Sequence, residues 1–305
     1  MTLAPVFNFD CEESKIRLSK DLSIRTMTDE EIQAIREYEK LARALPLRAI
    51  GKLKFAIDCT TEEPVLSEFL VHRKVVERIN LVTAAFRIWG GVIYPTFLRI
   101  EVSNVLYSTS TGKENRDSIF AFEPLQIIGL PSPAPVAMDE KRQFSKADAE
   151  AFAQLFRNMD EANHGRMKVA FQRLKMFTEE VWPESIIDAM IGFEALYSDK
   201  NEVAKGPPIA QKTAKLIGRS HDEATFIESF LAEAYRLRNK IVHGEDVTPD
   251  HWVRLTRMVF GNDPDLKTFL SESIGDSDRD IPATAALETL GSYLCRSIQA
   301  KLPQK

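Results

Sequence analysis

An arginine and a histidine stand five residues apart in the segment Tyr235–Gly244, which reads YRLRNKIVHG. Arg238 is followed directly by Asn239, and His243 is followed directly by Gly244. An imidazole, with an ordinary pKa of about 6.5, can accept or donate a proton near neutral pH. A guanidinium group is permanently charged, and its planar fork of N–H donors suits phosphate oxygens. These side chains therefore form the candidate catalytic group of the chain.

The same segment has the pattern of a helix, which decides which of its side chains share a face. At about 100° per residue, Arg238 and His243 lie roughly 140° apart around a helix. Asn239 and His243 are four residues apart and share a face, and Arg236 joins them from one further turn back. We therefore expect Asn239 to orient His243, with Arg236 nearby and Arg238 reaching the site from the side. Two such helices that meet across a dimer axis would bring these charges together.

A purely structural role is the alternative for these residues. A histidine just before a helix-ending glycine commonly interacts with the helix dipole, and Arg238 could pair with Glu245 or Asp246.

The segment Arg157–Gly165 repeats the order Arg-Asn…His-Gly with a longer spacer. Acidic residues intervene in that second segment, and its pattern indicates a helix end followed by a turn.

The chain that must position the candidate site is helical in pattern from residue 145 onwards. Ser145–Asp148 and Ser220–Glu223 each have the spacing of a capping box at a helix start. Apolar residues then recur with helical spacing, and Gly244 stands where a helix-ending glycine belongs. Together these patterns favour an antiparallel helical bundle. Beyond the helix that starts at Ser145, the helices are predicted over residues 166–181, 184–197, 208–217 and 221–243, from residue 249, and over 283–300.

The first third of the chain mixes strand and helix signals. Thr28–Glu31 is a third capping box, at the start of an exposed helix that ends before Pro46. A long apolar-periodic stretch over residues 65–89 predicts another helix. The predicted strands alternate apolar and polar residues or are rich in β-branched and aromatic residues, and they cover residues 52–59, 92–107 and 118–128.

A proline-rich segment separates these two regions. Pro131, Pro133 and Pro135 alternate, which prevents both a helix and a central strand. The sequence therefore predicts an α+β N-terminal domain over residues 1–140 and an all-α helical bundle over residues 141–305.

Composition limits the classes of function that remain. The 305 residues hold 40 Lys+Arg and 45 Asp+Glu, for a formal net charge of −5, which argues against a surface that grips nucleic acid along its whole extent. Three scattered cysteines form neither a disulfide framework nor a paired-cysteine metal site. The phosphate-binding, dinucleotide-binding, zinc-protease and α/β-hydrolase motifs are absent from the sequence. We expect a cytoplasmic protein that does not enter the membrane.

The helix-end segment resembles the signature of the Apea-like branch of the HEPN domains, in which an arginine and a polar residue precede His-Gly at the end of a helix. The resemblance extends over about residues 165–250. MIGFEALYS (190–198) resembles the family's helix with an apolar-Glu-Ala-Leu core, and IAQKTAKLIG (209–218) resembles its short basic-apolar helix. The chain departs from toxin-type members at residue 245, where glutamate replaces the tyrosine that their antitoxin modifies.

This resemblance implies an all-α C-terminal HEPN bundle and a metal-independent endoribonuclease that needs no cofactor. It also implies a homodimer in which the arginine and histidine of both protomers line one cleft. RNA would be cut by its own 2′-hydroxyl, which leaves a 2′,3′-cyclic phosphate. In that reaction we assign His243 as general acid/base and Arg238 as the clamp on the transition state, with Asn239 as the third catalytic residue.

Residues 205–243 contain seven basic and four acidic residues and so carry a local charge of +3, in contrast to the chain as a whole. The resemblance further implies antiviral defence or toxicity, with a regulatory protein or antitoxin as a possible partner and the N-terminal domain as a sensor. The alternative is a non-catalytic HEPN module that binds RNA, a nucleotide or a protein. The RNA contacts are expected from Arg236, Lys240, Lys212 and Lys215.

Overall fold

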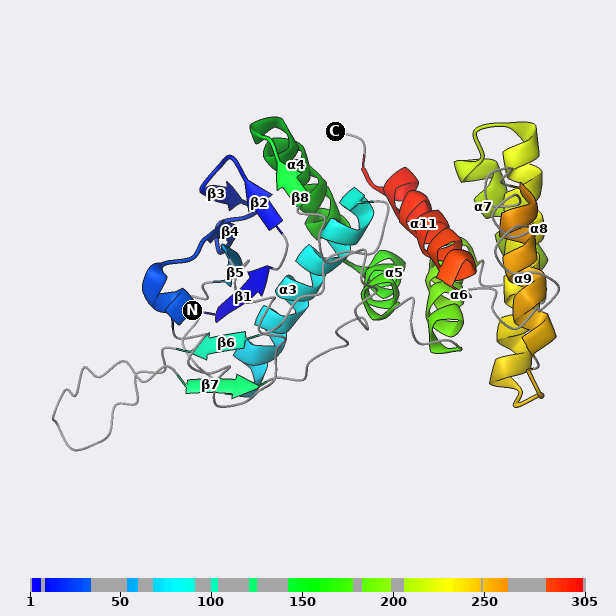
Figure 1. Cartoon of the computed structure of the whole chain (residues 1–305), viewed down its shortest axis with the longest axis horizontal. Helices are drawn as coiled ribbons and strands as arrows, with labels where there is room; N and C mark the ends of the chain where they lie inside the picture. Colours follow the sequence, from blue (N-terminus) through cyan, green and yellow to red (C-terminus); the bar gives the residue numbers. More distant parts are fainter. Residues whose placement is uncertain are drawn as a thin grey trace, which may run out of the picture. The chain divides into compact units, whose positions relative to one another are not determined.

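A computed structural model gives the structure of the chain in eleven described ranges, which are residues 2–6, 9–33, 54–59, 68–90, 100–103, 121–124, 142–177, 183–198, 206–247, 249–262 and 284–303. In these ranges an N-terminal region with small sheets precedes a helical region, which confirms the predicted class at this level (Figure 1). The chain divides into two compact units. The sheet unit comprises residues 1–85 and 95–157, and the helical unit comprises residues 86–94 and 158–305.

The main sheet of the sheet unit has four antiparallel strands in the order β1-β5-β4-β3. The central strand β5 pairs with β1 on one side and with β4 on the other, and Phe55, Ala56 and Ile57 on it are fully buried. The strand predicted over residues 52–59 is thereby confirmed. The strands are β1 (Thr2–Val6), β3 (Lys15–Arg17), β4 (Leu22–Thr26) and β5 (Phe55–Cys59).

Two further strand pairs complete the unit. Strand β2 (Phe9–Cys11) runs parallel to β8 (Arg142–Phe144). Strands β6 (Ile100–Ser103) and β7 (Ala121–Pro124) are antiparallel and fall within the two segments predicted as strands from their β-branched and aromatic residues. The pairing of β2 with β8 brings the chain beyond residue 140 back to the sheet unit.

An aromatic cluster packs β8 and the start of the following helix against β2 and β5. The Phe9 ring contacts those of Phe55 and Phe144 edge to face, at centroid distances of 5.2 and 4.9 Å. The Phe144 ring contacts Phe152 at 5.5 Å, on helix α4 (Lys146–Ala162). All four rings are buried, and such pairs add to the free energy of area burial by about 1 kcal/mol each.

The two units divide later than the sequence predicts. The expected boundary lies between residues 140 and 141, whereas the structure divides within α4, between Arg157 and Asn158. The physical reason is that β8 and the start of α4 contribute to the core of the sheet unit, which local sequence patterns cannot reveal. The three alternating prolines lie outside the described residues.

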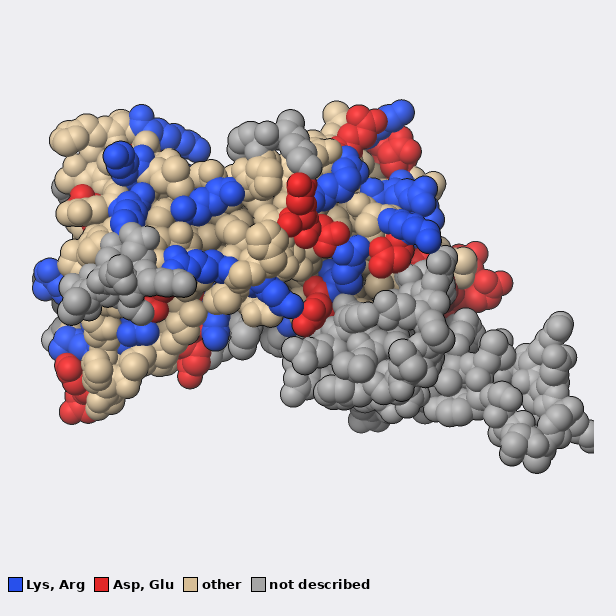
Figure 2. Space-filling model, turned by 180° about the vertical axis from the view of Figure 1, so that it is seen from behind, with Lys and Arg blue, Asp and Glu red and all other residues tan. Residues whose placement is uncertain are grey.

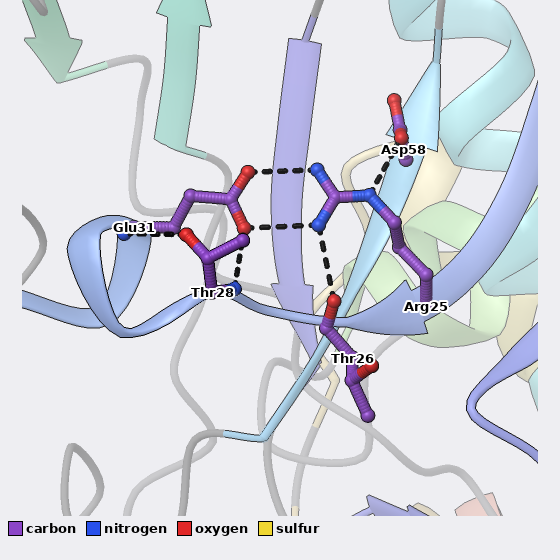
Figure 3. A network of polar contacts seen from close by, with 5 residues as sticks. All are labelled: Arg25, Thr26, Thr28, Glu31 and Asp58. Atoms are coloured by element: carbon purple, nitrogen blue, oxygen red, sulfur yellow. Dashed lines mark hydrogen bonds and ion pairs between the residues drawn. The ribbon is translucent and has the colours of Figure 1, made fainter.

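The capping box at Thr28 is confirmed and belongs to a larger polar network (Figure 3). Thr28 Oγ1 accepts the Glu31 N–H at 3.2 Å, and Glu31 Oε2 accepts the Thr28 N–H at 2.8 Å. The Glu31 carboxylate also binds both terminal nitrogens of Arg25, at 2.9 and 2.7 Å, while Arg25 Nε donates to Asp58 at 2.7 Å. The Arg25 guanidinium holds the pKa of Glu31 below its ordinary value. Arg25 thus joins a helical turn to strands β4 and β5.

The helical unit consists of helices that confirm the predicted elements. Helix α11 packs against α5, α6, α7 and α9, and α7 joins α8 through the turn Gly218–Ser220. The predicted capping box at Ser145, at the start of α4, is confirmed as well. The helices are α5 (Gly165–Met176), α6 (Glu184–Tyr197), α7 (Gly206–Ile217), α8 (His221–Val242), α9 (Pro249–Asn262) and α11 (Thr284–Lys301).

Helix α3 (Glu68–Gly90), which confirms the helix predicted over residues 65–89, ends inside the helical unit. The buried Arg87 donates to the carbonyl oxygens of Leu174 and Phe177 at the end of α5. These carbonyls have no partner within their own helix, so the guanidinium group satisfies them. Gln299 on α11 binds the Ile88 carbonyl at 3.3 Å and fixes the same helix end.

Candidate active site at the end of helix α8

Helix α8 carries the candidate site at its C-terminal end and is held firmly at its N-terminal end. Ser220 Oγ accepts the Glu223 N–H at 3.1 Å, as the capping spacing predicts. The Glu223 carboxylate does not close the box on Ser220. It accepts the Arg219 N–H at 2.6 Å and pairs with Arg296 of α11 at 2.8 Å. Arg296 also lowers the pKa of Glu223. The helix start is therefore anchored to α11.

The C-terminal end of α8 closes in a Schellman motif. Gly244 has φ +69°, and its N–H donates to the Ile241 carbonyl at 3.1 Å. The Glu245 N–H donates to the Lys240 carbonyl at 2.9 Å. This hydrogen-bond pair defines the motif, and the left-handed conformation explains the glycine. The predicted helix-ending glycine is confirmed.

His243 is the capping residue of this helix end. Its backbone N–H donates to the Asn239 carbonyl at 3.0 Å, so the position of its Cα is fixed by the helix. Its imidazole is exposed and makes no hydrogen bond or ion pair with any residue that the structure describes. The result is an exposed imidazole on a helix end whose backbone is held by hydrogen bonds.

Arg238 lies on another side of α8, and its side chain is only 20% exposed. Its Nη1 donates to Asn239 Oδ1 at 3.0 Å, and its Nη2 lies 3.6 Å from Glu194 Oε1 on α6. Its guanidinium group also lies over the Tyr235 ring, 5.7 Å from the centroid. Its Nε is buried and has no hydrogen-bond partner in the described part of the chain. The contacts hold Arg238 in place and leave part of its hydrogen-bonding capacity unused.

Glu194 and Tyr235 complete this cluster, and sequence reasoning gave neither a role. The Tyr235 hydroxyl donates to Glu194 Oε1 at 3.1 Å. Burial, followed by the charge of Glu194, raises the pKa of Tyr235. Gly206 at the start of α7 lies against the same ring, and a Cβ there would approach Tyr235 Cδ1 to 2.5 Å. Helices α6, α7 and α8 therefore meet at the Tyr235 side chain. We call Glu194, Tyr235, Arg238 and Asn239 the Arg238 cluster.

The cluster differs from the arrangement that helical geometry predicts. The Asn239 amide oxygen binds Arg238, and no side-chain hydrogen bond joins Asn239 to His243 among the described residues. Arg236 turns away to Glu233, with a separation of 2.8 Å. Asn239 thus orients the arginine rather than the histidine, because the adjacent guanidinium group is the nearer charged donor.

The acidic residues after the helix do not pair with Arg238, as the structural alternative would require. Glu245 instead lies 3.4 Å from Lys240, and Glu245 is exposed while Lys240 is half-buried. Arg238 pairs with Glu194, which stands 44 residues earlier in the chain. The charge of Arg238 is therefore balanced from α6, and the acidic residues face the solvent beside His243.

The other predicted RNA-binding residues lie on α7. Lys215 is exposed, and Lys212 donates to the Tyr197 carbonyl at the end of α6, at 3.2 Å. On the left side of Figure 2, basic side chains spread over the helical unit with few acidic ones between them. The described residues of this unit include 15 Lys and Arg and 13 Asp and Glu, a difference of +2.

The rival segment Arg157–Gly165 is a helix end with a turn, as its sequence predicts. Helix α4 ends at Ala162, His164 precedes α5, and Gly165 has φ +51°. Arg157 binds Gln154 of its own helix at 2.8 Å.

No protein-family model, curated protein or solved structure matches the chain. In the described ranges, no three His, Cys, Asp or Glu side chains are grouped so that they could hold a metal ion. The helices described here also include none with the length and apolar character needed to cross a membrane. The class of protein must therefore be inferred from the geometry at the end of α8.

Proposed function

We propose that the protein is a HEPN-type, metal-independent endoribonuclease that acts as a homodimer. The observation that carries the proposal is that an exposed His243, on a fixed helix end, follows five residues after Arg238, which Asn239 and Glu194 hold on the same helix. The first side chain can move a proton near neutral pH, and the second offers a permanent charge. RNA cleavage by the 2′-hydroxyl needs both functions and no cofactor.

The reaction assigns a separate task to each residue. A base removes the proton of the 2′-hydroxyl, the 2′-oxygen attacks phosphorus, and the bond from phosphorus to the 5′-oxygen breaks. An acid then protonates the 5′-oxygen, so the products are a 2′,3′-cyclic phosphate and a 5′-hydroxyl. His243 of one protomer acts as the base and His243 of the other as the acid. Arg238 stabilises the additional charge on the phosphorane, and Asn239 holds its guanidinium group.

The directions of the side chains support the proposed use of two chains. Arg238 faces α6 and lies about 140° around α8 from the side that bears His243. One chain therefore presents one exposed histidine and an arginine turned to the side. A second copy, packed with its own helix end against the first, supplies the missing acid and the charge on the opposite flank.

The cellular role is part of the same proposal. A cytoplasmic RNase of this kind acts in antiviral defence or as a toxin, and the sheet unit detects a trigger or binds a regulatory protein. An antitoxin that modified a tyrosine two residues after the histidine would find Glu245 there. Regulation of this chain would therefore depend on another contact.

The test is RNA cleavage by purified protein in the presence of EDTA. We expect the wild type to cut total RNA, and Arg238→Ala and His243→Ala each to lose at least about a hundredfold in rate. The matched control is His221→Ala, which removes an exposed histidine at the opposite end of the same helix. Equal degradation by all four proteins would identify a contaminating nuclease and contradict the proposal.

The second candidate is a non-catalytic module that binds RNA, a nucleotide or a protein. The observation in its favour is that Arg238 is engaged by Glu194 and Asn239, which limits its access to a phosphate. In that case, expression of the chain would be harmless to a host cell, and His243→Ala would change nothing. Toxicity that His243→Ala abolishes would decide for the nuclease, even where the purified protein awaits a trigger.

A further inference from the structure

A groove of about 470 Å³ lies between helices α8 and α9. Its size is within the range of sites that bind small ligands or parts of a larger one. Hydroxyl groups, acidic groups and two arginines line it, together with apolar surface that includes Ala232 and Met258. Its charged lining residues are Glu228, Glu233, Arg236 and Arg254.

One carboxylate in this groove holds two guanidinium groups. Glu233, with a side chain only 12% exposed, lies 2.8 Å from Arg236 Nη1 and 3.4 Å from Arg254 Nε. Both arginine side chains are 68% exposed, and their remaining N–H donors are open to the solvent. The three residues together carry a charge of +1. The buried acid thus fixes two exposed cations at a set separation, a suitable arrangement for an extended anion.

His243 lies beyond Arg236 along α8 and is not among the residues that line the groove. The histidine follows Arg236 by seven residues, which places it on the same side of α8 and about 10 Å further along the axis. Glu228 lies in the opposite direction, about 12 Å from Arg236 along the helix. A polyanion bound by Arg236 and Arg254 would therefore lie about two turns of α8 before His243, on the same side of the helix, and away from Glu228.

We propose that this part of the groove binds the sugar–phosphate backbone of single-stranded RNA beside the bond to be cut, with Arg236 and Arg254 as phosphate ligands. The inference rests on the proposed nuclease function and adds a substrate path to it. Arg254 and Glu233 are new to the site, because sequence patterns around His243 include only Arg236. Glu233 acts as a positioning residue, since it holds both arginines and repels phosphate itself.

Binding of a short, fluorescently labelled single-stranded RNA tests this path. The titrations are followed by anisotropy in EDTA, at several KCl concentrations, and all variants carry His243→Ala so that the probe stays intact. We expect Arg254→Ala to weaken binding by about fivefold and Arg254→Glu by more. The slope of log affinity against log salt should also fall, by about 0.7 for the phosphate contact that is lost. Arg157→Ala, which removes an exposed arginine of the sheet unit, is the matched control and should leave binding unchanged.

Cleavage by the same variants with an intact His243 separates the two proposals. The path is supported if Arg254→Ala raises KM for RNA several-fold and changes kcat little. If Arg254→Ala and Arg254→Glu bind RNA like the parent while cleavage still depends on His243, the path is overturned and the nuclease stands. If both variants lose RNA binding but no protein cleaves, RNA binding in the groove stands, whereas the nuclease and the place of the groove beside a cut bond are overturned. A groove that binds polyglutamate and not RNA would overturn the path in favour of an acidic protein partner.

Discussion

Two arginines of similar burial, one in each unit, are held in very different ways. Arg25 and Arg238 have side chains 18% and 20% exposed. Arg25 makes four hydrogen bonds of 2.7 to 3.0 Å to Asp58, Thr26 and Glu31, so each of its three nitrogens has an acceptor (Figure 3). Arg238 has one hydrogen bond of 3.0 Å, a longer ion pair of 3.6 Å and a buried Nε without a partner.

This difference in hydrogen bonding helps to separate an arginine with a structural role from one with a functional role. A buried arginine with all its donors paired stabilises a fold and has little capacity left for a ligand. One with an unpaired buried donor is less favourable for folding, which makes it a candidate for a functional role. Because the residue type and the burial are the same, only the hydrogen-bond partners distinguish the two arginines. We therefore assign Arg25 to the architecture of the sheet unit and Arg238 to the proposed site.

The largest effect should come from removing Arg25. Arg25→Ala leaves Glu31 and Asp58 without their common partner, and we expect the local free energy of unfolding to fall by about 3 kcal/mol. Hydrogen exchange of the β5 amides measures this loss within the sheet unit. Arg238→Ala should leave exchange in β5 unchanged and lower protection in α8 by only about 1 kcal/mol. If the two variants lost equal free energy of unfolding, each in its own unit, Arg25 and Arg238 would not differ in their structural role.

Close packing around the Arg238 cluster gives the next effect. Gly206→Ala places a Cβ about 2.5 Å from the Tyr235 ring, and such overpacking costs about 2 kcal/mol. The shifted ring should also displace Arg238 and lower RNA cleavage. The double variant Gly206→Ala/Tyr235→Ala removes the ring, so a thermodynamic cycle should show that the two costs are not additive. Additive costs would mean that the contact between α7 and α8 has relaxed without affecting the arginine.

The pH dependence of stability should show how much the charge of Glu31 contributes to the network around Arg25. The Arg25 bond depresses the pKa of Glu31 from 4.5, so its stabilisation is complete above pH 4.5 and is lost as the pH falls through the folded-state value. Glu31→Gln should therefore be less stable than the wild type at pH 7, and the difference should shrink below pH 4.5. Glu30→Gln, in the same helical turn but exposed, is the control and should show no such difference. A constant difference at all pH values would mean that the capping geometry, rather than the charge, stabilises the turn.

Much of the helical framework could be predicted because its signals are local. Ser145, Ser220 and Gly244 mark helix ends through hydrogen bonds that span three to five residues, and the structure has these ends where the spacing indicates. The place of His243 at a helix end is local in the same sense. The boundary between the units could not be predicted, because it depends on β8 pairing with a strand more than 130 residues earlier.

The partners within the candidate site were also beyond local patterns. Helical periodicity places Asn239 beside His243, but it gives no account of Glu194, which reaches Arg238 only because α6 packs against α8. The same holds for Arg254, which shares Glu233 with Arg236 from the neighbouring helix. A sequence shows which side chains share one helix face, while charge balance between helices requires the fold.

The smallest effect should come from the Tyr235 hydroxyl, and it tests whether the Arg238 cluster is adjustable. Tyr235→Phe removes the 3.1 Å hydrogen bond to Glu194 and keeps the ring beneath the guanidinium group, so stability should change by less than about 1 kcal/mol. Glu194 would then be free to draw Arg238 closer than the present 3.6 Å. Because the guanidinium group would be bound more tightly by Glu194, it would be less available to RNA, and RNA cleavage should fall about two- to threefold. Glu194→Gln weakens that ion pair and should act in the opposite direction on cleavage. Rates that fall equally in both variants would mean that Glu194 only supports the helix packing, and the contrast with Arg25 would then rest on Arg238 and Asn239 alone.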